Sequence, residues 1–125
     1  MLQTTLMKHR HQMKTTPIEN CHDGLGRINC TRVLDRNDPG TTYLKLIHDD
    51  ILPPGISIGI HTHRNECEYY YILSGSGVMT LDGVEHPVQA GDLTAVFPGG
   101  SHGLENRSEQ DMRIMVIGLE VKKPS

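Results

Sequence analysis

The sequence predicts an all-β protein built as a sandwich or barrel of antiparallel strands. Turn signals recur at short intervals from Pro17 onward, with Asp-Gly pairs at 23 and 82 and Pro-Gly pairs at 39, 54 and 98. The short segments between them are rich in β-branched and apolar residues, which favour strands. No segment repeats apolar residues at the helical spacing for long, so we expect no helix beyond a single turn.

The first sixteen residues differ from the rest of the chain. They are polar and basic without a sustained period, so we expect residues 1–16 to form a flexible N-terminal arm. The later segments follow as strands of one barrel domain over residues 17–121. The expected strands are 27–34, 41–52, 56–63, 68–75, 77–83, 84–90, 92–98, 102–106 and 112–121.

Two bends turn the middle of this series into a meander. Asp82 and Gly83 separate two strands, and both residue types accept a positive φ, which predicts a type I′ hairpin turn. Gly75 and Gly77 form the bend before it.

Length and charge restrict the class of protein. A chain of 125 residues with 36% hydrophobic residues supports one modest core. The net charge of −3 comes from intermixed acids and bases, so we expect no nucleic-acid partner. No apolar run approaches the roughly 20 residues that cross a bilayer, and the start lacks a signal-peptide core, so we expect no membrane partner and a cytoplasmic location.

Three cysteines without a C-x-x-C pair suit a reducing compartment; a Cys21–Cys30 bridge is the less favoured alternative.

The chemistry-bearing stretch begins at His61. Alternation along a strand places His61 and His63 on one face, and an antiparallel return brings Glu68 beside them. His102 follows a glycine turn downstream and is the candidate fourth ligand. Imidazole and carboxylate ligands suit one divalent transition-metal ion, with Fe, Mn, Ni, Zn and Cu as alternatives. The competing interpretation is an exposed histidine pair and a solvated turn carboxylate.

The same alternation assigns the residues before the histidines. We expect small residues to share the histidine face and leave open volume there, and isoleucines to point the other way. The small residues are Gly55, Ser57 and Gly59, and the isoleucines are Ile56, Ile58 and Ile60.

Tyr70 shares the face of Glu68 by parity, whereas Cys67 faces away from it. Tyr70 is therefore a candidate catalytic residue that orients a ligand or substrate through its hydroxyl, or else a plain barrel-filling aromatic. Tyr43 and Lys45 rank below it as residues bordering the mouth. For the remaining histidines we expect surface or hydrogen-bonding roles; they are His9, His11, His22, His48 and His86.

Two motifs make the chain resemble the cupin family of small double-stranded β-helix (jelly-roll) barrels. The first motif of that family is matched at every spacing by Gly55, His61, His63, Glu68 and Gly75. The second is matched by Gly91, Gly99, His102 and Asn106, but its proline position holds Phe97 and Pro98 follows one place later. Motif positions spread over two segments are far more specific than a lone histidine pair.

The resemblance implies that the two histidines and the glutamate of the first motif and the histidine of the second, His61, His63, Glu68 and His102, hold one metal ion, and that Asn106 is structural. It also implies a small metal-dependent enzyme acting on a small polar organic substrate, of isomerase or dioxygenase type, with a non-catalytic small-molecule-binding module as the alternative.

Several predicted strands have apolar residues on both faces, which indicates that their outer face is also buried against another part of the chain or another subunit. The outward isoleucines of segment 56–63 and residues of segment 112–121 are of this kind. Because the chain has no helices to cover them, we expect a homodimer, with cover by the chain's own N-terminal strands as the alternative.

Overall fold

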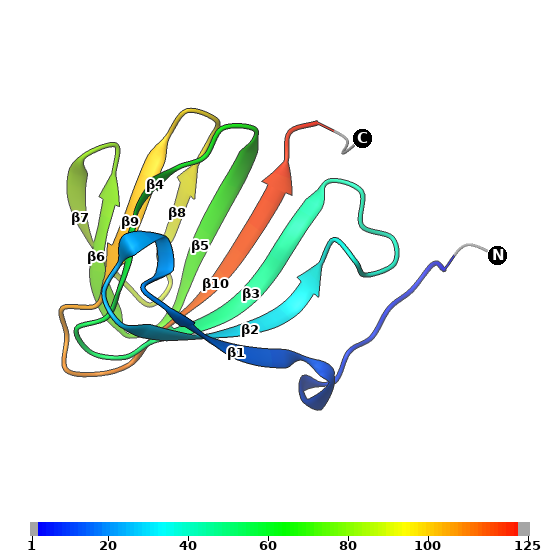
Figure 1. Cartoon of the computed structure of the whole chain (residues 1–125), viewed down its shortest axis with the longest axis horizontal. Helices are drawn as coiled ribbons and strands as arrows, with labels where there is room; N and C mark the ends of the chain where they lie inside the picture. The colour runs from blue at the N-terminus through cyan, green and yellow to red at the C-terminus, as the bar shows by residue number, and fades with distance from the viewer. Residues whose placement is uncertain (1–2, 123–125) are drawn as a thin grey trace.

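The computed structural model describes residues 3–122 and folds them into two antiparallel β-sheets (Figure 1). The six-stranded sheet has the order β1 (Lys14–Glu19), β2 (Arg27–Asp35), β3 (Leu44–Leu52), β10 (Met112–Glu120), β5 (Glu66–Ser74) and β8 (Leu93–Val96). The four-stranded sheet has the order β4 (Ser57–Thr62), β9 (Ser101–Glu105), β6 (Ser76–Leu81) and β7 (Val84–Gln89). The predicted all-β jelly-roll fold is confirmed.

The helices of the described residues are two three-residue 3-10 turns, η1 (Arg10–Gln12) and η2 (Cys21–Asp23). Within residues 3–122, no helix has the length and hydropathy needed to cross a membrane.

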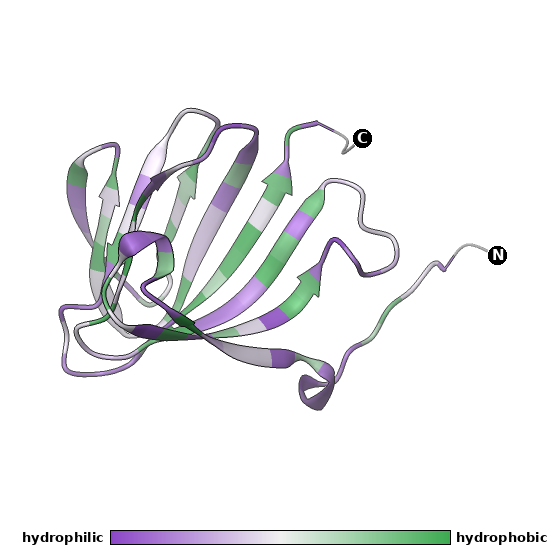
Figure 2. Cartoon of the chain, in the orientation of Figure 1, coloured by the Kyte–Doolittle hydropathy of each residue, from purple (hydrophilic) through white to green (hydrophobic). Residues whose placement is uncertain are grey.

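Both sheets contribute side chains to one hydrophobic core. The six-stranded sheet supplies Ile72 and Ile114, and the four-stranded sheet supplies Met79 and Leu104. Figure 2 shows the hydrophobic colour concentrated on the strands, most clearly on β10, while several connections between strands are hydrophilic. The alternation predicted for β5 is present, because Tyr70 and Ile72 are buried while Tyr71 is exposed.

The first strand, β1, is not among the strands predicted above. Strand β1 begins at Lys14, so it includes three residues assigned above to the N-terminal arm, and it pairs with β2 along its whole length. Before it, Lys8 forms an ion pair with Asp38, and Arg10 forms one with Asp49. Residues 1 and 2 of the arm lie outside the described residues.

A β-bulge in β4 corrects the predicted side-chain alternation. Ile58 pairs with Leu104 and His61 pairs with His102, so two β4 residues lie opposite the single residue Gly103. The extra residue reverses the parity of the strand. Ile58 is therefore in the core at 4% exposure, whereas Ile60 is 64% exposed, and the expectation that Ile58 faces away from the interior is wrong.

The small residues of β4 allow the segment 20–26 to pack closely against this strand. They do not leave open volume at the site. A Cβ on Gly59 would lie 1.9 Å from the carbonyl oxygen of His22, so only glycine permits this approach of η2. The Ser57 amide donates to Leu25 O, and Ser57 Oγ accepts from the Leu25 amide. Residues 20–26 therefore cover the free edge of β4.

The hairpin turn between β6 and β7 has the predicted conformation. Asp82 and Gly83 have φ values of 46° and 83°, as a type I′ turn requires.

Candidate metal centre

Four side chains from neighbouring strands meet between the two sheets. His61 lies on β4 and His63 follows that strand, Glu68 lies on β5, and His102 lies on β9 directly opposite His61. One nitrogen or oxygen atom from each of the four lies within 4.8 Å of the others. The structure thus brings together all four residues singled out as metal ligands.

The Pro98 turn positions the two motifs relative to each other. The Gly99 amide donates to His63 O, and the His63 amide donates to Gly100 O. These two backbone bonds tie the turn before β9 to the residue after β4. The displaced proline of the second motif therefore leaves His102 in place opposite His61.

The nitrogen and oxygen atoms converge at distances that suit a common ion. His102 Nε2 lies 3.0 Å from His63 Nε2 and 3.1 Å from His61 Nε2. Glu68 Oε1 lies 3.2 Å from His102 Nε2 and 3.4 Å from His63 Nε2. Metal–ligand bonds of about 2.1 Å at right angles place neighbouring donors about 3.0 Å apart. The residues present therefore fit a divalent ion.

Hydrogen bonds on the outer side of two imidazoles fix their orientation. His61 Nδ1 lies 2.7 Å from Gly59 O, and His63 Nδ1 lies 2.7 Å from Glu66 Oε1. Each Nδ1 therefore bonds away from the cluster, and each ring turns its Nε2 atom toward the other candidate ligands. His102 differs, because its buried Nδ1 has no hydrogen-bond partner within residues 3–122.

Burial and charge set the protonation states within the cluster. Burial raises the pKa of Glu68, but the imidazoles of His102, His61 and His63 outweigh burial and hold that pKa well below its usual range. His102 is fully buried at 0% exposure, and burial lowers its pKa. A carboxylate and neutral imidazoles are the forms that bind metal ions.

Tyr70 packs against the cluster as parity predicts. Its ring centroid lies 4.6 Å from that of His102, with the planes tilted by 36°. Burial, reinforced by the charge of Glu68, raises the pKa of Tyr70 well above its usual value, so the phenol keeps its proton. Tyr70 is thus a buried O–H group beside the candidate ligands.

The structure adds to the site two residues, Glu66 and His22, that no sequence motif indicated. Glu66 joins His63 to Lys45, whose Nζ lies 2.6 Å from Glu66 Oε2. The sequence signal for the contact between Glu66 and His63 is the spacing, because Glu66 is an acidic residue three positions after a candidate ligand. His22 stacks on His61 from η2; no local pattern indicates this contact, because it depends on how residues 20–26 cross the edge of β4.

The other residues considered lie apart from the four-residue cluster. Asn106 is buried, and its Nδ2 donates to Leu52 O and Gln110 O, as a structural residue does. Cys67 is half-buried and pairs with Leu119. Cys21, Cys30 and Cys67 are free thiols in this structure.

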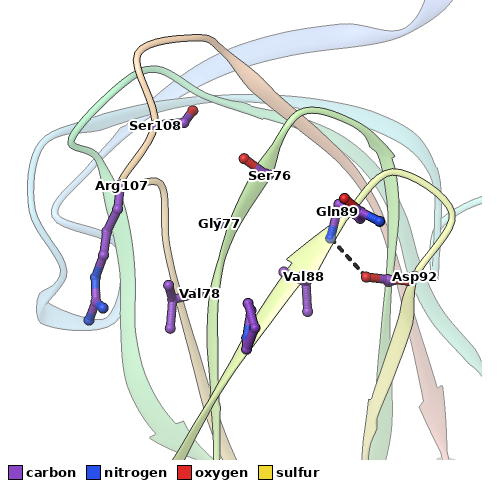
Figure 3. A pocket seen from close by; sticks show the side chains of 9 residues that line it. Ser76, Gly77, Val78, Val88, Gln89, Asp92, Arg107 and Ser108 are labelled. Carbon is purple, nitrogen blue, oxygen red and sulfur yellow. Dashed lines mark hydrogen bonds between the residues drawn. The ribbon is translucent and has the colours of Figure 1, made fainter.

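A separate surface pocket of about 510 Å³ lies at the β6–β7 hairpin (Figure 3). Val78 and Val88 line it, with Arg107 at one edge, and the Gln89 amide donates to Asp92 Oδ2 at another. None of the four clustered residues lines this pocket.

The fold and the cluster together define a β-barrel protein with a three-histidine, one-glutamate group between its sheets. The chain belongs to the cupin family, because the Cupin domain model matches residues 49–118, more than half of the sequence. That match spans all four clustered residues.

Several known proteins resemble this chain in sequence or in structure. An oxalate-binding protein of Thermotoga maritima is 34% identical over 100 residues, which cover 80% of this chain and 82% of that protein. The crystal structure of a predicted oxalate decarboxylase from Thermotoga maritima superimposes with a TM-score of 0.84 at 29% identity, covering 93% of this chain and 100% of that one. KdgF from Halomonas sp. has a TM-score of 0.76 at 17% identity, over 95% and 96% of the two chains, and shares the fold.

Proposed function

We propose that His61, His63, Glu68 and His102 hold one divalent transition-metal ion, which in turn binds a small dicarboxylate of the oxalate type. The observation that carries the metal is the outward bonding of two Nδ1 atoms, which leaves the Nε2 atoms of both rings and the Glu68 carboxylate directed at one point. The metal is one of Fe, Mn, Ni, Zn and Cu, since all accept imidazole and carboxylate ligands.

Coordination chemistry supports a small chelating ligand. Four protein ligands leave two positions on a six-coordinate ion, and the two carboxylates of oxalate present one oxygen to each. The bound ion supplies the positive charge that holds and polarises these oxygens. Burial of His63, Glu68 and His102 restricts the size of the ligand. The similarity to an oxalate-binding protein supports the same ligand class.

Turnover of the bound ligand is the second candidate function. Tyr70 favours it, because a protonated phenol beside His102 is positioned to give a hydrogen bond or a proton to a ligand at the cluster. Under this hypothesis the protein is a small metal-dependent enzyme. Isomerase and dioxygenase chemistry then stand beside decarboxylation as the reactions to test.

Calorimetric titration of the manganese-loaded protein with oxalate tests the binding function. We expect saturable binding of oxalate at about one equivalent, no comparable binding of acetate, and loss of the signal in His63→Ala. His86→Ala is the matched control, because His86 is exposed on β7. Equal heats for the wild type and His63→Ala would contradict the proposal.

Product analysis distinguishes binding from turnover. Incubation with oxalate followed by measurement of formate and carbon dioxide should give products only if the protein is an enzyme. In that case Tyr70→Phe, which removes the hydroxyl and keeps the ring, should reduce the rate while oxalate still binds. Binding without any product identifies the non-catalytic function.

A further inference from the structure

A second cluster of metal-binding side chains lies on the six-stranded sheet. Cys30 on β2 pairs in register with Asp50 on β3, and His48 lies two residues before Asp50 on the same strand. Alternation along β3 turns His48 and Asp50 to one face. The sulfur, one imidazole nitrogen and one carboxylate oxygen lie within 4.8 Å of one another. None of these residues belongs to the histidine–glutamate cluster.

Asp50 has an unsatisfied carboxylate oxygen. The residue is 4% exposed, and its Oδ1 has no hydrogen-bond partner among residues 3–122. The adjacent Asp49 contrasts with it, because Arg10 and Arg113 both bind the Asp49 carboxylate. Burial raises the pKa of Asp50 to about 7, and this effect outweighs the lowering of that pKa by a hydrogen bond with Cys30. A cation at Asp50 would supply the missing partner.

The spacing of the other two donors matches a tetrahedral site. Cys30 Sγ lies 3.4 Å from His48 Nδ1. With a zinc–sulfur bond of about 2.3 Å and a zinc–nitrogen bond of about 2.05 Å, tetrahedral geometry places the two donors about 3.6 Å apart. Thiolate, imidazole and carboxylate are all established zinc ligands. Cys30 is 1% exposed while His48 is half-buried, so an ion would reach the cluster from the His48 side.

We propose that Cys30, His48 and Asp50 form a second cation site for a thiophilic divalent ion such as Zn²⁺. Three protein ligands leave the fourth tetrahedral position to water or to a ligand atom. Binding breaks the S–H bond of Cys30 and forms a metal–sulfur bond, and the proton passes to solvent together with any proton on Asp50. This site is independent of the proposed oxalate function, since it shares no residue with the first cluster.

Cobalt substitution tests the second site without interference from the first. Co²⁺ bound to a thiolate gives an intense near-ultraviolet charge-transfer band, whereas a site of three imidazoles and one carboxylate has no sulfur ligand. We expect this band to saturate at about one equivalent in His61→Ala, in which the first cluster is disrupted. Zn²⁺ added afterwards should abolish the band as it displaces Co²⁺.

Substitutions of the proposed ligands assign the site. Cys30→Ser, with oxygen in place of sulfur, should abolish the band, and Asp50→Asn, which retains the side-chain shape, should weaken Co²⁺ binding at least tenfold. Cys67→Ala is the matched control and should keep the full band. Circular dichroism of the metal-free variants checks that each one folds; if Cys30→Ser does not fold, His48→Gln on the half-buried ligand replaces it. A missing band in His61→Ala, or an equal band in Cys30→Ser, would overturn the proposal.

Discussion

His22 stacks on His61 with the ring centroids 3.6 Å apart and the planes within 12° of parallel. His22 adopts a positive φ of 50°, which is uncommon for a residue with a side chain. The contact covers one face of His61, while Gly59 O accepts the hydrogen bond from the Nδ1 of that imidazole. The ring of His61 is therefore held from two sides.

Removing the stacked ring should weaken metal binding. We expect His22→Ala to reduce Mn²⁺ affinity about tenfold, because the His61 ring gains freedom that binding must then restrict. His22→Phe keeps a flat ring and has the same backbone constraint, so it should retain most of the affinity. Competition against a fluorescent chelator measures both. Equal affinities for the Ala and Phe variants would show that the stack does not support the site.

Glu66→Gln should weaken metal binding through His63. The substitution keeps the side-chain shape but removes the negative charge that holds the Nδ1 hydrogen of His63. We expect a loss of about 10- to 100-fold in Mn²⁺ affinity, the range typical of such partners of a ligand. Glu85→Gln on the exposed β7 strand is the control and should match the wild type. An unchanged affinity in Glu66→Gln would mean that the contact does not orient the ligand.

The sequence is sufficient to predict most of the strands and the four clustered residues, because turn residues and strand alternation are local properties. The orientation predicted for Ile58 from strand alternation is wrong, because a β-bulge in β4 shifts the register. No residue pattern in the sequence indicates this bulge. Strand β1 was missed because its residues are polar and pair with β2 at the sheet edge.

Local sequence patterns do not predict contacts between residues that only the pairing of distant strands brings together. The Cys30, His48 and Asp50 group forms only because β2 and β3 align in one register, and the three residues match neither motif. His48 illustrates the point: it was assigned a surface or hydrogen-bonding role, and its position beside Cys30 became visible only in the fold.

Arg113 should stabilise the fold through Asp49. The Arg113 Nη2 atom lies 2.6 Å from Asp49 Oδ2, and Nε donates to Oδ1 at 2.9 Å, so the pair is bidentate. The hydrogen bonds from Arg113 outweigh burial and lower the pKa of Asp49, which keeps the buried carboxylate charged. Arg113→Met should therefore reduce the free energy of unfolding by about 1–2 kcal/mol, with Arg10 still in contact with Asp49.

Urea unfolding at neutral pH measures this effect, and Arg27→Met is its control. Arg27 pairs with Glu19 where both side chains are exposed, so its loss should cost no more than about 0.5 kcal/mol. Equal losses for the two variants would rule out a special role for the buried carboxylate.

The outer face of the six-stranded sheet should form a homodimer interface. Tyr71 and Leu93 pair across β5 and β8 and are 42% and 60% exposed, and the outward residues Met115 and Ile117 of β10 continue the apolar surface. We expect light scattering with size exclusion to give the mass of two chains. Tyr71→Lys combined with Leu93→Lys should give the mass of one chain, while Val84→Lys on the other sheet should leave the dimer intact. A monomeric wild type would contradict this expectation.

The most direct test of the metal centre is a Mn²⁺ titration followed by electron paramagnetic resonance. Mn²⁺ favours oxygen and nitrogen ligands over thiolate, so it reports on His61, His63, Glu68 and His102 and not on the Cys30 group. We predict that the wild type and His86→Ala bind about one Mn²⁺ ion per chain, and that His61→Ala and Glu68→Gln lose this binding. Binding of one ion by both His61→Ala and Glu68→Gln with wild-type affinity would contradict this prediction.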